Sequence, residues 1–108
     1  MITITDLTAI LQSTGLPVAH QAFPVNHAPE MPFIIYQVTG SDNIGADNIV
    51  WIPVRRVQVD LLCKQWDPAT EHLIEQTLTG AGIYWEREPE YDTDEQYYRS
   101  TYVFEIGG

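Results

Sequence analysis

The chain has 108 residues, the usual length of one domain, which leaves no room for a second hydrophobic core. Fifteen acidic residues against five Lys and Arg give a formal net charge of -10, which excludes the basic surface needed for direct nucleic-acid binding and disfavours binding to anionic membranes. The single cysteine, Cys63, excludes an intrachain disulfide and a cysteine-cluster zinc site, and no apolar run approaches the ~20 residues of a membrane span.

The first predicted element is an amphipathic helix over about residues 4–14. Thr3 and Asp6 have the spacing of a capping box, in which side chains satisfy the free amides of the first turn, and Gly15 ends the helix. Residues 16–32 contain four prolines and no steady periodicity, so we interpret them as a surface connection with room for one short edge strand. The predicted buried face of the helix comprises Ile4, Leu7, Ile10 and Leu11.

Two strands are predicted next, joined by a loop. Residues 33–39 form a run of β-branched and aromatic residues, which is typical of a strand. Residues 56–64 alternate between polar and apolar side chains with a period of two, which places one set inward. Residues 41–48 are predicted to be a loop, and its shortness favours an antiparallel hairpin. The inward set of the second strand is Val57, Val59, Leu61 and Cys63.

The second half of the chain contains another helix and two more strands. Asp67 and Pro68 predict the start of the helix, since Asp caps free amides and Pro suits the first helical position. Strands are predicted over residues 83–88 and 97–106, with an acidic turn over residues 89–95 between them. The buried stripe of this helix is predicted to be Ala69, Leu73, Ile74, Thr77 and Leu78, with Glu71 and Glu75 facing water.

These elements predict a single α+β domain over residues 1–108, in the order helix, strand, strand, helix, strand, strand. The sheet is expected to be mostly antiparallel, to occupy residues 33–106 together with the second helix, and to carry both helices on one face.

No constellation of residues predicts catalysis, so we expect no catalytic residue, no cofactor and no metal site. The three histidines lack the spacing of zinc ligands, and an inward-facing Cys63 is expected to be an inert thiol. The acidic segment lacks the glycine of a calcium-binding EF-hand loop, so we interpret it as a solvated hairpin tip. A small acidic domain that binds a ligand or a metal through this segment remains an alternative. The acidic residues concerned are Glu88, Glu90, Asp92, Asp94 and Glu95.

Large apolar residues gather near the tip of the first predicted hairpin, where a small domain has little core to cover them. Exposed apolar clusters with a polar surround usually mark interaction sites, so we predict a protein-interaction surface. The alternative is that Trp51 folds back over the first helix. The predicted interaction residues are Ile44, Ile49, Val50, Trp51 and Ile52.

Six short segments follow one another in a defined order between residues 30 and 106. They are Pro32-Phe33-Ile34-Ile35-Tyr36, Val57-Gln58-Val59-Asp60-Leu61, Asp67-Pro68-Ala69, Gly82-Ile83, Tyr91-Asp92-Thr93-Asp94 and Tyr102-Val103-Phe104-Glu105-Ile106. In this order and spacing the chain resembles the tail terminator (tail completion) proteins of long-tailed bacteriophages, and is similar to the U protein of phage lambda.

The resemblance implies a structural virion assembly protein without enzymatic activity. It implies a homohexameric ring that caps the tail tube and takes part in head–tail joining. The implied partners are further copies of the chain, the tail tube protein and the head–tail connector or another neck protein, with DNA passing through the ring unbound. The implied location is the tail or neck of the virion, after assembly in the host bacterial cytoplasm. The alternative within the same virion is another neck or head-completion protein.

Overall fold

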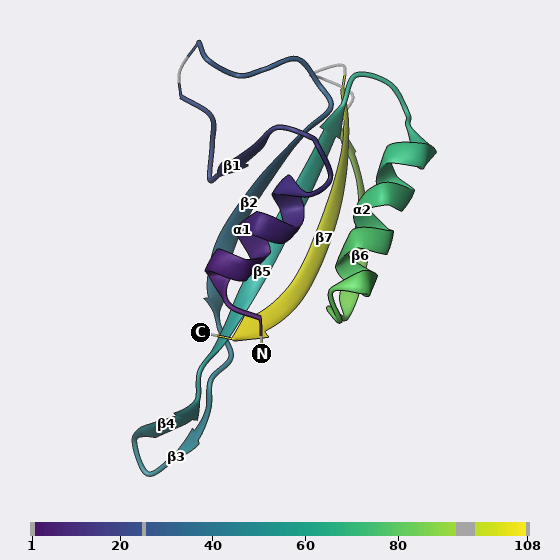
Figure 1. The fold of residues 1–108 in the computed structure, drawn as a ribbon. Coiled ribbons are helices and arrows are strands. Elements are labelled where there is room, and N and C mark those ends of the chain that lie inside the picture. The colour runs from purple at the N-terminus through teal and green to yellow at the C-terminus, as the bar shows by residue number, and fades with distance from the viewer. Residues whose placement is uncertain (1, 25, 93–96, 108) are drawn as a thin grey trace.

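The computed structural model describes residues 2–24, 26–92 and 97–107, and the side chains within these ranges except those of residues 89–92. In this part of the chain, five strands form one sheet in the order β1-β2-β5-β7-β6 (Figure 1). Only β1 and β2 run parallel, and every other neighbouring pair is antiparallel. The strands are β1 (Val18–His20), β2 (Phe33–Ser41), β5 (Val54–Cys63), β6 (Trp85–Asp92) and β7 (Tyr97–Gly107).

Two helices accompany the sheet, and side chains cap both at their N-termini. At the start of α1 (Ile4–Gln12), the amide of Thr3 donates to the Asp6 carboxylate at 3.0 Å, and the Thr3 hydroxyl accepts from the Asp6 amide. At the start of α2 (Pro68–Gly80), the Asp67 carboxylate accepts from the amide of Thr70 at 3.1 Å. The α+β class and the mostly antiparallel sheet predicted from the sequence are thereby confirmed.

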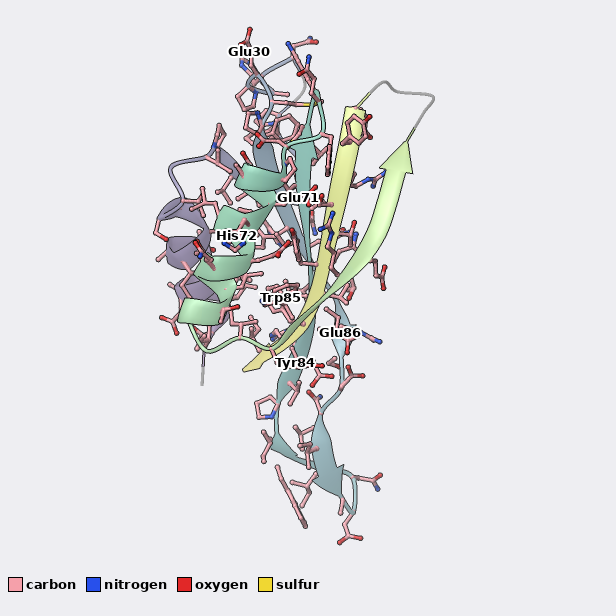
Figure 2. All side chains as sticks on the ribbon, turned by 90° about the vertical axis from the view of Figure 1, so that its right-hand side faces the viewer. Glu30, Glu71, His72, Tyr84, Trp85 and Glu86 are labelled. Carbon is pink, nitrogen blue, oxygen red and sulfur yellow. The ribbon has the colours of Figure 1, made fainter. Side chains whose placement is uncertain are left out.

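The hydrophobic core joins the two helices to one face of the sheet. Leu7 and Leu11 of α1 and Ile74 and Leu78 of α2 have no exposed surface and belong to one buried cluster. Figure 2 shows the two helices beside each other on the same side of the sheet. The strand residues in this cluster are Ile34, Tyr36, Val57, Val59, Leu61, Cys63, Tyr102, Phe104 and Ile106.

A second, two-stranded sheet stands apart from the main one. It consists of β3 (Ile44–Ala46) and β4 (Ile49–Ile52), which pair antiparallel. β3 lies within residues 41–48, which the sequence predicted to be a loop, and β4 follows in residues that were assigned to no strand. Asp47 and Asn48 connect them with φ of 55° and 64°, the left-handed conformation that both central residues of a type I′ hairpin turn require. The order of elements therefore differs from the predicted six through this hairpin. β1 is a short edge strand within the proline-rich connection, for which the sequence left room.

The faces of α2 also differ from the prediction. Glu71, predicted to face water, is buried at 8% exposure, whereas Leu73 is 39% exposed and Ala69 is exposed as well. The physical reason is that Arg87 and Ser100 supply polar partners for the Glu71 carboxylate underneath the helix.

The strand after α2 is shifted toward the C-terminus. The sequence predicted it over residues 83–88, but β6 runs from Trp85 to Asp92 and so takes in part of the predicted acidic turn. The shift arises because Gly82, at φ 78°, turns the chain so that the amide of Ile83 donates to the carbonyl of Leu78, which completes the end of α2. Among the described residues, neither helix has the length and hydropathy needed to cross a membrane.

Candidate protein-interaction site

The β3–β4 hairpin projects from the body of the molecule, beyond the end of β7 (Figure 1). The molecule is elongated, with principal extents of 49 × 29 × 24 Å. Every residue of β3 and β4 is exposed. Of the nine large apolar side chains that the structure describes as exposed, five lie in this hairpin, so they form a cluster rather than a scatter. We call the five the hairpin patch: Ile44 (54% exposed), Ile49 (62%), Val50 (55%), Trp51 (66%) and Ile52 (42%).

These are the residues that the sequence singled out as an interaction surface. Trp51 is two-thirds exposed, so its ring does not fold back over α1. An isolated two-stranded hairpin has little stability of its own, and this one has no helix over either face. Its apolar side chains therefore contribute little to the fold of the free chain.

The base of the hairpin is fixed to the main sheet by polar contacts. The amide of Asp42 donates to the carbonyl of Val54 at 3.0 Å, and the amide of Val54 donates to the side-chain oxygen of Asn43 at 2.9 Å. Pro53 has no amide hydrogen to continue the ladder, and at the next residue the Asn43 side chain, in place of a backbone carbonyl, accepts from the amide of Val54. The hairpin is therefore held in a defined position although its strands are separate from the main sheet.

A charged group lies beside this base. The Arg56 guanidinium lies 3.9 Å from the Asp42 carboxylate, and both side chains are about half exposed. A side-chain hydrogen bond with Asp42 raises the pKa of Glu105, helped by partial desolvation and by repulsion from Asp42, while Arg56 opposes the shift. Protonation of Glu105 therefore favours the contact between its carboxyl group and that of Asp42.

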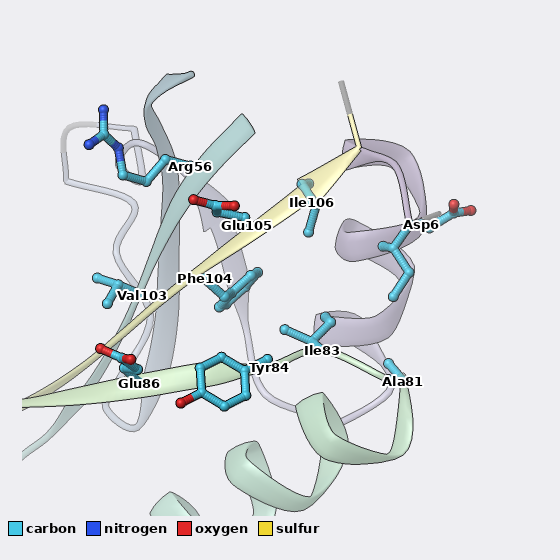
Figure 3. A pocket seen from close by; sticks show the side chains of 12 residues that line it. Asp6, Arg56, Ala81, Ile83, Tyr84, Glu86, Val103, Phe104, Glu105 and Ile106 are labelled. Carbon is cyan, nitrogen blue, oxygen red and sulfur yellow. The ribbon is translucent and has the colours of Figure 1, made fainter. Parts of the chain in front are cut away.

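A broad hollow with a volume of about 1020 Å³ opens near the same end of the sheet (Figure 3). It lies where β6 begins and β7 continues past it, and the start of α1 and the link from α2 to β6 complete its wall. Ile83, Phe104 and Ile106 form an apolar floor that is continuous with the core. Tyr84 stands at the mouth with 82% of its surface exposed, and charged side chains form the rim. The charged rim residues are Asp6, Arg56, Glu86 and Glu105.

The hollow was not predicted from the sequence, because its lining comes from separate segments that only the tertiary fold brings together. One local signal was available. In the pair Tyr84-Trp85, adjacent strand-like positions point to opposite faces, and here Trp85 packs against the core while Tyr84 points into water.

A cluster of buried and half-buried polar groups anchors α2 to the sheet. The Arg87 guanidinium lies 2.6 Å from one oxygen of Glu71, and the Ser100 hydroxyl donates to the other at 3.1 Å. The Tyr102 hydroxyl donates to Glu75 at 2.8 Å, and burial, followed by this contact, raises the pKa of Tyr102. Each of these groups has a partner within the fold, so we interpret the cluster as structural.

The predicted acidic residues fall only partly within the described structure. Glu88 is exposed on β6, opposite Thr101 of β7 and therefore on the face of the sheet that carries no helix. Glu90 and Asp92 belong to β6 by their backbone, but their side chains lie outside the described set, and Asp94 and Glu95 lie outside the described residues altogether. Within the described part of the chain, no three His, Cys, Asp or Glu side chains gather in a way that holds a metal ion.

Cys63 is buried, as its strand position predicted. Burial raises the pKa of its thiol to about 11, with Asp67 and Glu71 adding to the effect. The thiol is therefore protonated at neutral pH and is a poor nucleophile.

No family model matches the sequence, and no curated protein matches it.

Proposed function

We propose that this chain is a structural virion assembly protein that forms an oligomeric ring and caps the tail tube of a long-tailed bacteriophage. The observation that carries the proposal is the hairpin patch, five large apolar side chains exposed together on a projecting hairpin that the free chain does not need for its core. Such a surface favours binding to another protein over catalysis. The order of sequence segments described above supplies the connection to tail terminators.

The physical requirements of a ring fit this chain. A closed ring of identical subunits needs a heterologous contact, in which two different patches of the same chain meet head to tail. The chain offers the hairpin patch and, as a separate surface, the hollow floored by Ile83 and Phe104. The formal charge of -10 keeps free subunits apart by repulsion before assembly.

In this proposal the partners are other copies of the chain, with six in the ring, the tail tube protein on one side and the head–tail connector on the other. The acidic residues from Glu88 to Glu95 line the lumen, where they repel the phosphates of passing DNA and let it slide without binding. The assembled protein is located at the tail–neck junction of the virion.

The experiment that tests the proposal is solution mass measured by light scattering over a range of concentrations, with electron microscopy of any large species. Six subunits of 12.3 kDa predict a species of about 74 kDa with a central hole. Co-sedimentation with tail tubes and with the connector complex then separates the alternatives. A tail terminator binds the tube, whereas another neck protein binds only the connector side. A chain that binds neither tail tubes nor the connector complex would contradict the proposal.

A further inference from the structure

We propose that the β3–β4 hairpin of one copy docks into the hollow of the next copy, with Trp51 seated over the floor formed by Ile83 and Phe104. This inference rests on the proposed ring and names the contact that closes it. The two surfaces are separate in one chain, and both are apolar where they would meet. One is convex and projecting, and the other is concave.

The geometry makes this a contact between molecules. The hairpin projects away from its own body (Figures 1 and 2), while the hollow lies at the base of the hairpin and has Arg56 of β5 in its wall. The tip, at Asp47 and Asn48, is thus directed away from the hollow of its own chain. A projecting patch that fits a hollow elsewhere on the same chain generates a head-to-tail contact, which closes into a ring or extends as a filament.

The low charge of the hairpin itself fits an apolar hollow better than a strongly basic surface. From Asn43 to Ile52 the hairpin contains no Lys or Arg and a single acidic residue, Asp47. It therefore offers almost nothing to pair with the charges of a basic partner. The hollow has an apolar floor, with its acidic groups at the rim, so a nearly neutral hairpin can enter without burying a carboxylate. Two chains that each carry a charge of -10 make contact most readily through their least charged surfaces.

The hairpin patch is small, so a single contact through it is weak and a closed ring is favoured over a complex of two chains. Trp51 is 66% exposed and its neighbours about half exposed, so the patch offers on the order of 350 Å² of apolar surface. Counted on both partners this is about 700 Å², below the ~1,200–2,000 Å² of a stable two-protein interface. A single contact is therefore weak. In a closed ring every subunit makes the contact twice, once through its hairpin and once through its hollow. The contact that closes the ring joins two subunits of the same assembly, so its effective concentration is high.

The first experiment is cysteine cross-linking between singly substituted chains. Ile49 belongs to the hairpin patch, two residues before Trp51 on β4, and Tyr84 stands at the mouth of the hollow. Mixing Ile49→Cys with Tyr84→Cys under mild oxidation should give a disulfide-linked dimer at least about tenfold more readily than mixing Ile49→Cys with His72→Cys. His72 is exposed on α2, away from the hollow. The native Cys63 does not compete, because it is buried.

The second experiment uses a matched pair of tryptophans. Trp51 and Trp66 are similarly exposed, at 66% and 69%, but Trp66 lies in the link between β5 and α2, at the opposite end of the sheet from the hairpin (Figure 1). Trp51→Ala should reduce the ring to the 12.3 kDa monomer in light scattering, while Trp66→Ala leaves it intact. Circular dichroism of both variants checks that the fold is retained.

The outcomes separate this inference from the proposed function. Selective disulfide linkage of the Ile49→Cys chain to the Tyr84→Cys chain, together with loss of the ring in Trp51→Ala, supports it. A ring that survives Trp51→Ala and gives no selective linkage would overturn the hairpin–hollow contact and leave the ring standing, with the hairpin free for the tail tube. A wild-type chain that is monomeric at every concentration, with substituted chains that do not cross-link, would overturn this inference and, if it also fails to bind tail tubes, the proposed function too.

Discussion

Replacing Arg87 by alanine is expected to destabilise the fold by about 2 kcal/mol, because the substitution leaves the Glu71 carboxylate under α2 without its cation. The Glu71 side chain is only 10% exposed, and its oxygen lies 2.6 Å from the Arg87 guanidinium. Removing one partner of a fully buried ion pair costs ~3–5 kcal/mol, whereas a surface pair contributes ~0–1 kcal/mol. Arg87 is 40% exposed, so water screens the pair and an intermediate value applies.

The assay is urea unfolding followed by circular dichroism. A loss of about 2 kcal/mol shifts the midpoint by about 1 M and lowers Tm by roughly 8–16 °C for a domain of this size. The matched control is Arg55→Ala, which removes an exposed arginine from β5 and should cost less than ~0.5 kcal/mol.

A double-mutant cycle tests the cause. Glu71→Gln removes the charge that needs Arg87 but keeps an oxygen that can accept from Ser100. In that background Arg87→Ala should cost less than ~1 kcal/mol, which gives a coupling of about 1 kcal/mol or more. Equal losses for Arg87→Ala and Arg55→Ala, or no coupling between positions 71 and 87, would refute the argument that Arg87 compensates a buried carboxylate.

Three further predictions concern the core, a helix cap and the buried thiol. Leu11→Ala should cost ~2–5 kcal/mol in urea unfolding, because Leu11 is fully buried between α1 and the sheet; a loss below ~1 kcal/mol would contradict this. Hydrogen bonds from Thr70 lower the pKa of Asp67 in the folded state, so the carboxylate stabilises the fold fully above its unfolded-state pKa of about 4 and loses this contribution as the pH falls through the lowered folded-state pKa. The destabilisation by Asp67→Ala seen in urea unfolding at pH 7 should therefore disappear at strongly acidic pH. Cys63, with its pKa raised to about 11, should resist iodoacetamide at about pH 8 until urea unfolds the chain; rapid labelling of the native protein would show that the thiol is accessible.

The sequence predicted those parts of the fold that depend on neighbouring residues. The caps at Thr3 and Asp67 each rest on a contact three residues away, and the inward set of β5 follows from a period of two. The exposure of Trp51 was likewise predictable, since a hairpin tip lies beyond the reach of a small core. These features need no knowledge of where distant segments lie.

Most of the features that the sequence did not predict depend on residues far apart in the chain. Helical periodicity assigned Glu71 to water, but its burial depends on Arg87 and Ser100, which follow it by 16 and 29 residues. Residues 41–48 were predicted to be a loop because turn-forming residues such as Gly and Asp occur among them, so β3 and its pairing with β4 were missed. Asp47 and Asn48 are residue types that tolerate the left-handed conformation of a tight turn, and this was the available signal for the hairpin. The hollow required four segments to be brought together, and no pattern along one segment contains that information.

The distribution of charge and apolar surface bears on how a chain with an exposed tryptophan hairpin avoids unselective association. Exposed sheet edges invite such pairing, yet the edge strand β1 has only three residues and the edge strand β6 carries Glu86 and Glu88 in exposed positions. The body therefore repels other chains through its acidic groups, while the hairpin remains nearly uncharged. Random encounters between such molecules are repulsive, and only an orientation that brings the hairpin to a matching apolar hollow removes apolar surface from water without burying charge. In the proposed ring, the same composition that keeps free chains apart would also restrict their association to the hairpin–hollow contact.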